Sequence, residues 1–81
     1  MDKTKKILVV EDDYVIRKIF NEILTDYYTI ELAEDANDAF DRLKNYTPDL
    51  MIVDIMMPGM NGLDMVKKIR GDKKFHKSII I

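Results

Sequence analysis

With 81 residues, the chain is long enough for one small domain, and a domain of this size buries only about 60% of the surface of its unfolded chain. Its 13 Lys and Arg residues nearly balance 15 Asp and Glu residues, and the formal net charge of −2 favours neither a nucleic-acid surface nor a membrane-binding patch. Cysteine is absent, which excludes a disulfide framework, a thiolate zinc site and a thiol nucleophile.

The first half of the chain shows the pattern strand, helix, strand. Ile7–Val10 is a continuous apolar run, too short for a signal peptide core or a membrane span, and it predicts a strand buried on both faces. Over residues 15–24 apolar residues recur every three to four positions, which predicts a helix with one buried stripe, capped by Asp12 or Asp13. Residues 28–33 alternate and are rich in β formers, which favours a strand near the edge of a sheet.

The second half repeats this alternation of helix and strand. Residues 35–46 predict a short amphipathic helix, which ends at Pro48 because proline disfavours helical geometry at the residue before it. Leu50–Val53 is another fully apolar run and predicts a second fully buried strand. A helical pattern follows over residues 63–70 and stops at Gly71.

Residues 78–81 begin a last β-branched run, so strands and helices alternate from one end of the sequence to the other. This order implies right-handed crossover connections and one parallel sheet with helices on both faces. We therefore predict a single three-layer α/β domain over residues 1–81, soluble and cytoplasmic, without repeats or linkers.

Acidic residues stand directly after the two strands that are predicted to be fully buried. Glu11, Asp12 and Asp13 follow the first strand, and Asp54 follows the second. Ligands of open parallel sheets bind outside the carboxyl ends of the strands, and adjacent strands lie about 4.8 Å apart. If these two strands are neighbours, their carboxylates crowd into one crevice, where a bound cation would neutralise their charge. Mg²⁺ fits such oxygen ligands, whereas the His and Cys ligands that would suggest zinc are missing.

With such an ion bound, one carboxylate can attack phosphorus and form a covalent aspartyl phosphate. Taken alone, an acidic triplet after a strand is more often a solvated turn and helix cap, but the acid after the second strand reverses those odds. A phosphatase of the haloacid dehalogenase type would need a second Asp two residues after the nucleophile, and Met56 occupies that position. The lone His76 and the clustered lysines are interpreted as exposed surface.

Two segments of the sequence, Ile7–Asp13 and Pro48–Gly62, resemble the signature segments of response-regulator receiver domains. The resemblance spans essentially all 81 residues and implies a flavodoxin-like fold, with strand order 2-1-3-4 in the part that is present. It also implies a function as the phosphoacceptor of a two-component phosphorelay, with a histidine kinase or phosphotransfer protein as partner and no direct contact with nucleic acid or membrane.

The resemblance also suggests a role for individual residues. Asp54 matches the phosphoacceptor, and Asp12 matches a direct Mg²⁺ ligand. Glu11 matches an acid that reaches the ion through water, and Met56 matches the residue whose backbone carbonyl binds it. Asp13 matches no invariant role.

The family's domain continues past Ile81, so we expect this chain to be a receiver truncated after the start of its fourth strand. The family's switch hydroxyl and active-site lysine lie in the later part, and Ser78 stands too early to replace the hydroxyl. Whether the chain acts as an enzyme on its own phosphorylation is therefore left open, and we expect phosphorylation of Asp54 to be slow or poorly retained. We also expect a homo-oligomer, joined through the last strand and an uncovered sheet face. The alternative is a non-switching fragment that acts only as a folding or self-association module.

Overall fold

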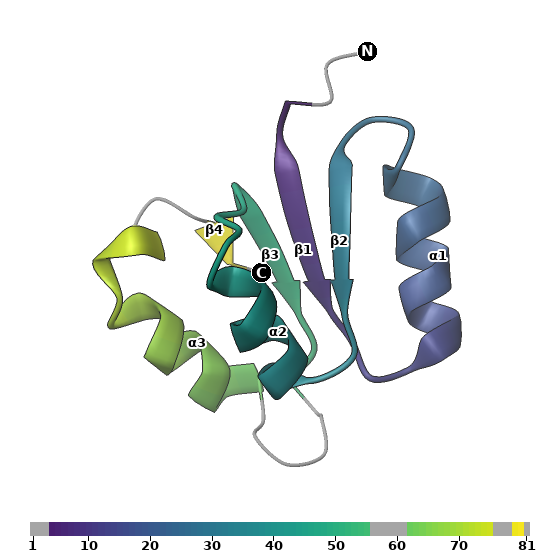
Figure 1. Cartoon of the computed structure of the whole chain (residues 1–81). Coiled ribbons are helices and arrows are strands. Elements are labelled where there is room, and N and C mark those ends of the chain that lie inside the picture. Colours follow the sequence, from purple (N-terminus) through teal and green to yellow (C-terminus); the bar gives the residue numbers. More distant parts are fainter. Residues whose placement is uncertain (1–3, 56–61, 76–78, 81) are drawn as a thin grey trace.

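The computed structural model describes residues 4–55, 62–75 and 79–80 (Figure 1). Strands and helices alternate along the chain, as the sequence predicts. The elements are β1 (Lys6–Val10), α1 (Tyr14–Leu24), β2 (Thr29–Ala33), α2 (Ala36–Leu43), β3 (Leu50–Val53), α3 (Gly62–Arg70), the 3₁₀ turn η1 (Lys73–Phe75) and β4 (Ile79–Ile80). Among the described residues, no helix is both long enough and apolar enough to cross a membrane.

The strands form one parallel sheet in the order β2-β1-β3-β4. The predicted order is confirmed for the first three strands, with β1 between β2 and β3. Val10 at the end of β1 pairs with Ala33 on one side and Val53 on the other, so these three strands end at the same level. Of the predicted last strand the structure describes Ile79–Ile80, which lies beside β3.

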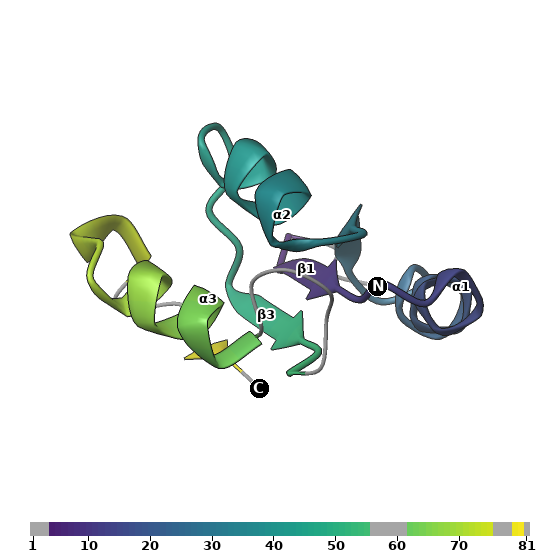
Figure 2. The ribbon, with the colours of Figure 1, turned by 90° about the horizontal axis from the view of Figure 1, so that it is seen from below.

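Helices lie on both sides of the sheet, with α2 and α3 on one side and α1 on the other (Figure 2). The main core is on the side of α2 and α3. Because successive residues of a strand point to opposite faces, one alternate set of β1 and β3 side chains faces these helices. The core on this side consists of Leu8, Val10, Ala33, Ala36, Ala39, Leu43, Met51, Val53, Met65 and Ile69, with Phe40 and Tyr46 packed against it.

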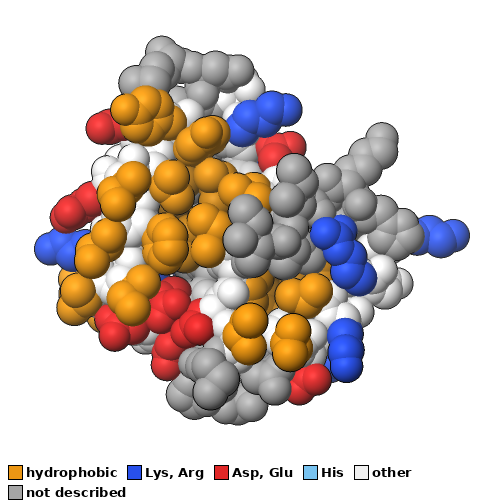
Figure 3. Space-filling view, turned by 180° about the vertical axis from the view of Figure 1, so that it is seen from behind, with side chains coloured by type: hydrophobic (Ala, Val, Ile, Leu, Met, Phe, Trp, Pro, Cys, Tyr) orange, Lys and Arg blue, Asp and Glu red, His pale blue; other side chains and the backbone are white. Residues whose placement is uncertain are grey.

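The opposite face is only partly covered, and here two predictions are wrong. Helix α1 contacts β2 and β1, and none of its side chains is fully buried, so the predicted buried stripe is not formed. Strand β3 was predicted to be fully buried, but Leu50 and Ile52 on this face are only partly buried. The physical reason is that α1 is the only described helix on this side and lies beside β2. Apolar side chains gather on the open face (Figure 3).

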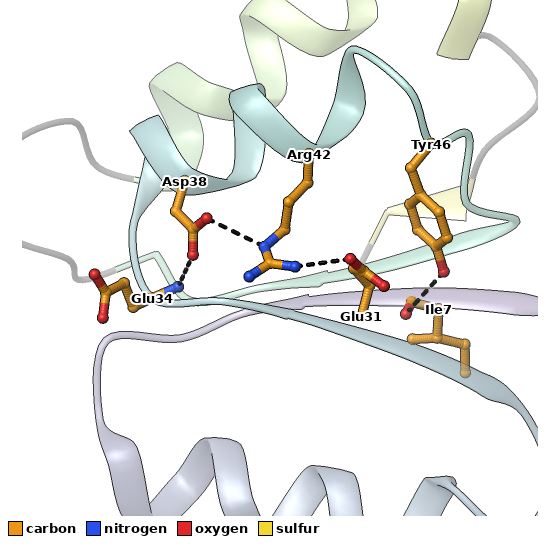
Figure 4. Close-up of polar contacts among 6 residues, drawn as sticks. All are labelled: Ile7, Glu31, Glu34, Asp38, Arg42 and Tyr46. Atoms are coloured by element: carbon orange, nitrogen blue, oxygen red, sulfur yellow. Dashed lines mark hydrogen bonds and ion pairs between the residues drawn. The ribbon is translucent and has the colours of Figure 1, made fainter.

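Polar contacts attach α2 to the sheet edge (Figure 4). Arg42 donates from Nη1 to Glu31 Oε1 on β2, at 2.7 Å, and from Nε to Asp38 Oδ1 one turn earlier, at 3.1 Å. The helix ends at Leu43 rather than at residue 46, because Lys44 and Asn45 donate to carbonyls only three residues back and tighten the last turn.

Tyr46 follows this turn and reaches across the sheet, where its hydroxyl donates to the carbonyl of Ile7 at 3.4 Å (Figure 4). Burial, with Glu31 and Asp49 nearby, raises the pKa of Tyr46 to about 12. The chain between α2 and β3 is therefore fixed to β1 by a side chain that is neutral at physiological pH.

Candidate functional site

The acidic residues after β1 and β3 lie side by side because the pairing of these strands continues past their ends. Asp54 donates its backbone N–H to the carbonyl of Val10 at 2.9 Å, and Glu11 donates to the carbonyl of Ala33 at 3.0 Å. One carboxylate oxygen from each of Glu11, Asp12 and Asp54 lies within 4.8 Å of the others. The structure thus brings together three of the four side chains that the sequence predicted to converge, and Asp13 is not one of them.

These carboxylates differ in burial, and their charges interact. Glu11 is 9% exposed, Asp54 is half-buried and Asp12 is exposed. Burial raises the pKa of Glu11, and the nearby carboxylates of Asp54 and Asp12 raise it further, although a hydrogen bond from the backbone N–H of Asp13 opposes the shift. Keeping these carboxylates ionised is therefore energetically unfavourable, and a bound cation would offset their mutual repulsion.

Asp13 has a different task from its neighbours. Its Oδ1 accepts the backbone N–H groups of Val15 and Ile16, at 2.8 and 3.2 Å, and so caps the first turn of α1. The sequence left the cap open between Asp12 and Asp13. Because Asp13 fills this position, the carboxylate of Asp12 is not used as the cap.

Arg17 was missed in the sequence, although it contacts the backbone of the acidic loop. Its Nη1 donates to the carbonyl of Glu11 at 2.8 Å and to the carbonyl of Asp12 at 3.0 Å. A cation this near the positive end of the helix dipole is electrostatically unfavourable. Arg17 stands only four residues after the helix cap. This unfavourable position is the feature of the sequence that could have indicated a partner for Arg17 outside the helix.

Gly62 brings the start of α3 against the end of β3. Its N–H donates to the carbonyl of Ile55 at 3.0 Å. A Cβ atom at this position would lie 2.4 Å from the carbonyl oxygen of Asp54 and 2.7 Å from Cα of Ile55, which is closer than atoms can approach. The absence of a side chain therefore lets α3 begin directly behind Asp54. Met56, predicted to lend its backbone carbonyl, lies outside the described residues.

The family model for the response regulator receiver domain matches residues 7–81. Among curated proteins, the chain is 46% identical over 67 residues to the Regulator of RpoS of Escherichia coli (strain K12), covering 82% of this chain and 20% of that protein. It is 38% identical over 66 residues to the Response regulator MprA of Mycobacterium sp. (strain KMS), covering 80% of this chain and 29% of that protein. The chain thus spans less than a third of either relative.

Solved structures of response regulators also resemble this chain. The chemotaxis protein CheY4 of Vibrio cholerae superimposes with a TM-score of 0.89 at 31% identity, over 94% of this chain and 64% of that chain. The response regulator TrrA of Thermotoga maritima, solved in complex with Mg(2+)-BeF, gives a TM-score of 0.81 at 40% identity, over 88% of this chain and 63% of that chain. The fold is therefore flavodoxin-like, as the sequence predicted, and the chain belongs to the response regulator receiver domain family of two-component signalling.

Proposed function

We propose that this chain is a phosphoacceptor module, in which Asp54 takes a phosphoryl group from a phosphohistidine of a histidine kinase or phosphotransfer protein. The observation that carries the proposal is the cluster of Glu11, Asp12 and Asp54 at the carboxyl edge of a parallel sheet, within 4.8 Å of one another. Ligands of open α/β sheets bind at this edge.

The donor atoms of the cluster fit Mg²⁺. All three side chains offer hard carboxylate oxygens, and Mg²⁺ usually binds one or two carboxylates while keeping several waters. Asp12 and Asp54 would hold the ion directly, and Glu11 would do so through water. When bound, the ion neutralises charge on the transferring phosphoryl oxygens. The solved complex of TrrA with Mg(2+)-BeF supports a site of this kind in a protein that is 40% identical.

The transfer itself needs a nucleophile and an accessible leaving group. A carboxylate oxygen of Asp54 attacks phosphorus, a P–O bond forms, and the P–N bond to the donor histidine breaks. The imidazole leaves with the electron pair and takes up a proton. Asp54 suits this role because it is half-buried, and the acidic cluster keeps its carboxylate beside the site of the cation.

The test measures phosphorylation and metal binding separately. A small-molecule acyl phosphate or phosphoramidate should add the mass of one phosphoryl group to the protein in the presence of Mg²⁺, and Asp54→Asn should abolish this gain. Asp12→Ala should weaken Mg²⁺ binding strongly, measured by backbone NMR shifts, because the site has few protein ligands. Asp41→Asn removes an exposed carboxylate on α2 and serves as the control. Phosphorylation of the Asp54→Asn protein would defeat the assignment.

We further propose a cytoplasmic location and self-association of this chain through β4 and the open face beside α1. The observation that supports self-association is a hollow on this face, lined mainly by the apolar side chains of Ile7, Leu24, Tyr28, Leu50 and Ile52. Contiguous apolar surface of this kind usually marks an interface. The alternative function is a non-switching module that only folds and self-associates, and the gain of a phosphoryl group on Asp54 distinguishes the two.

A further inference from the structure

We propose that Arg17 is a positioning residue for the carboxylate cluster, which it serves by holding the backbone carbonyls of Glu11 and Asp12. The inference rests on the proposed function, since it concerns the affinity of that cluster for Mg²⁺. It assigns a task to a side chain that is neither a metal ligand nor part of the core.

The geometry of the loop carries the inference. One nitrogen of Arg17, Nη1, donates to the carbonyl of Glu11 at 2.8 Å and to that of Asp12 at 3.0 Å. Consecutive carbonyls of an extended strand point in opposite directions. Two carbonyls that converge on one nitrogen therefore require the chain to turn at these residues, and the guanidinium stabilises that turn. These are charge-assisted hydrogen bonds, which are stronger than neutral ones.

The same turn also orients the side chains of the carboxylate cluster. Within it, the N–H of Asp13 donates to Oε1 of Glu11 at 3.2 Å, so the backbone that Arg17 holds also orients the carboxylate of Glu11. The N–H of Glu11 donates to the carbonyl of Ala33, which fixes the start of the turn to β2. Its other end is fixed by the capping carboxylate of Asp13. Arg17 is the contact that joins these two fixed ends.

Arg17 acts on the backbone rather than on the acidic side chains. The ion pairs of Arg42 with Glu31 and Asp38 and of Lys44 with Asp41 do not involve Arg17. The guanidinium also lies over the ring of Tyr14, with Cζ 5.8 Å from the ring centroid, which limits its motion. Arg17 therefore holds the loop through its backbone carbonyls and, within the described part of the chain, forms no ion pair with the acidic side chains.

The inference predicts a change in Mg²⁺ affinity that is opposite in direction to the change expected from the charge of Arg17 alone. A positive charge near the cluster repels Mg²⁺, so removing it tightens metal binding if charge alone matters. If Arg17 positions the loop, removing it weakens binding instead. Loss of a group that orients metal ligands typically costs 10–100-fold in affinity.

The experiment compares Arg17→Met with Lys18→Met, since both remove one positive charge from α1 and keep an unbranched side chain. Lys18 is exposed and contacts no carbonyl of the loop among the hydrogen bonds of the described residues. Mg²⁺ is titrated into isotope-labelled protein and followed by the amide shifts of the loop, and thermal unfolding is measured without metal. Hydrogen exchange of the Asp13 amide is measured in the same metal-free samples.

We expect Arg17→Met to bind Mg²⁺ about tenfold more weakly and to exchange the Asp13 amide faster. Lys18→Met should bind equally well or more tightly, with exchange at Asp13 unchanged. Arg17→Lys, which keeps the charge on a shorter side chain without the rigid guanidinium, should fall between Arg17→Met and the parent.

Binding by Arg17→Met that equals or exceeds that of the parent would overturn the inference. If Arg17→Met does not fold, parent-like affinity and Asp13 exchange in Arg17→Lys would do the same. If the parent binds no Mg²⁺, the proposed function fails instead, and exchange at Asp13 alone then shows whether Arg17 orders the loop.

Discussion

Replacing Asp54 by Asn should make the metal-free protein more stable while removing most of its stabilisation by Mg²⁺. The reason lies in the repulsion among Glu11, Asp12 and Asp54, whose carboxylate oxygens lie within 4.8 Å of one another. Asn has nearly the shape of Asp but no charge, and its amide can donate to the carboxylate of Glu11. The substitution therefore removes two repulsive pairs without opening a cavity.

The size of the effect follows from Coulomb's law. At 4.8 Å, two unit charges repel by about 0.9 kcal/mol in water and about 3.5 kcal/mol at an effective dielectric constant of 20. Because Asp12 is exposed and Asp54 is half-buried, the lower value is the better guide. Two such pairs give about 1–2 kcal/mol, and each kcal/mol raises the Tm of a domain of this size by about 4–8 °C.

Thermal unfolding with and without Mg²⁺ measures both parts of the prediction. The parent should gain about 2.7 kcal/mol at an Mg²⁺ concentration one hundred times its Kd, and Asp54→Asn should gain much less. Asp26→Asn, which removes an exposed charge in the turn after α1, should change neither quantity. The reasoning is refuted if Asp54→Asn unfolds at or below the Tm of the parent without metal and keeps the full response to Mg²⁺.

Three further outcomes are expected. Gly62→Ala should destabilise the fold by about 1–3 kcal/mol and weaken Mg²⁺ binding, measured by denaturation and NMR titration, because its Cβ would lie 2.4 Å from the carbonyl oxygen of Asp54. Stability should fall as the pH rises from 10.0 to about 12, because folded Tyr46 keeps a proton that the unfolded chain loses. Tyr46→Phe should flatten this fall in pH-dependent urea unfolding. Sedimentation equilibrium should show oligomers, and Ile52→Lys on the open face should weaken them; a parent that is monomeric at micromolar concentration contradicts the association.

The strands themselves and the acids at their ends were predictable because they depend on short, local patterns, whereas the strand order was implied by the resemblance to receiver domains. Ile7–Val10 and Leu50–Val53 are each a run of β-forming apolar residues that ends in an acid, and parallel pairing brings such ends together. The helix boundaries needed finer information. The sequence could not show that Lys44 and Asn45 would donate three residues back and end α2 before Tyr46.

Burial on the second sheet face could not be predicted in the same way. Apolar periodicity shows which side of α1 suits a core, but it does not show whether anything packs there. Ile19 and Ile23 follow the helical period and are nevertheless 49% and 60% exposed. Leu50 and Ile52 are likewise apolar in sequence and only partly buried in the structure. Burial is a property of the neighbouring elements, and the pattern of one segment does not contain it.

The site itself shows why its supporting residues were harder to predict than its carboxylates. Glu11, Asp12 and Asp54 stand out because acids follow both of the apolar runs that predict buried strands, whereas Arg17 and Gly62 act on the backbone and leave no comparable pattern. Arg17 holds two carbonyls of the loop, and Gly62 makes room for the carbonyl of Asp54. Both residues therefore shape the backbone that carries Glu11, Asp12 and Asp54. A substitution at Arg17 or Gly62 should therefore alter metal binding although neither residue can bind a metal.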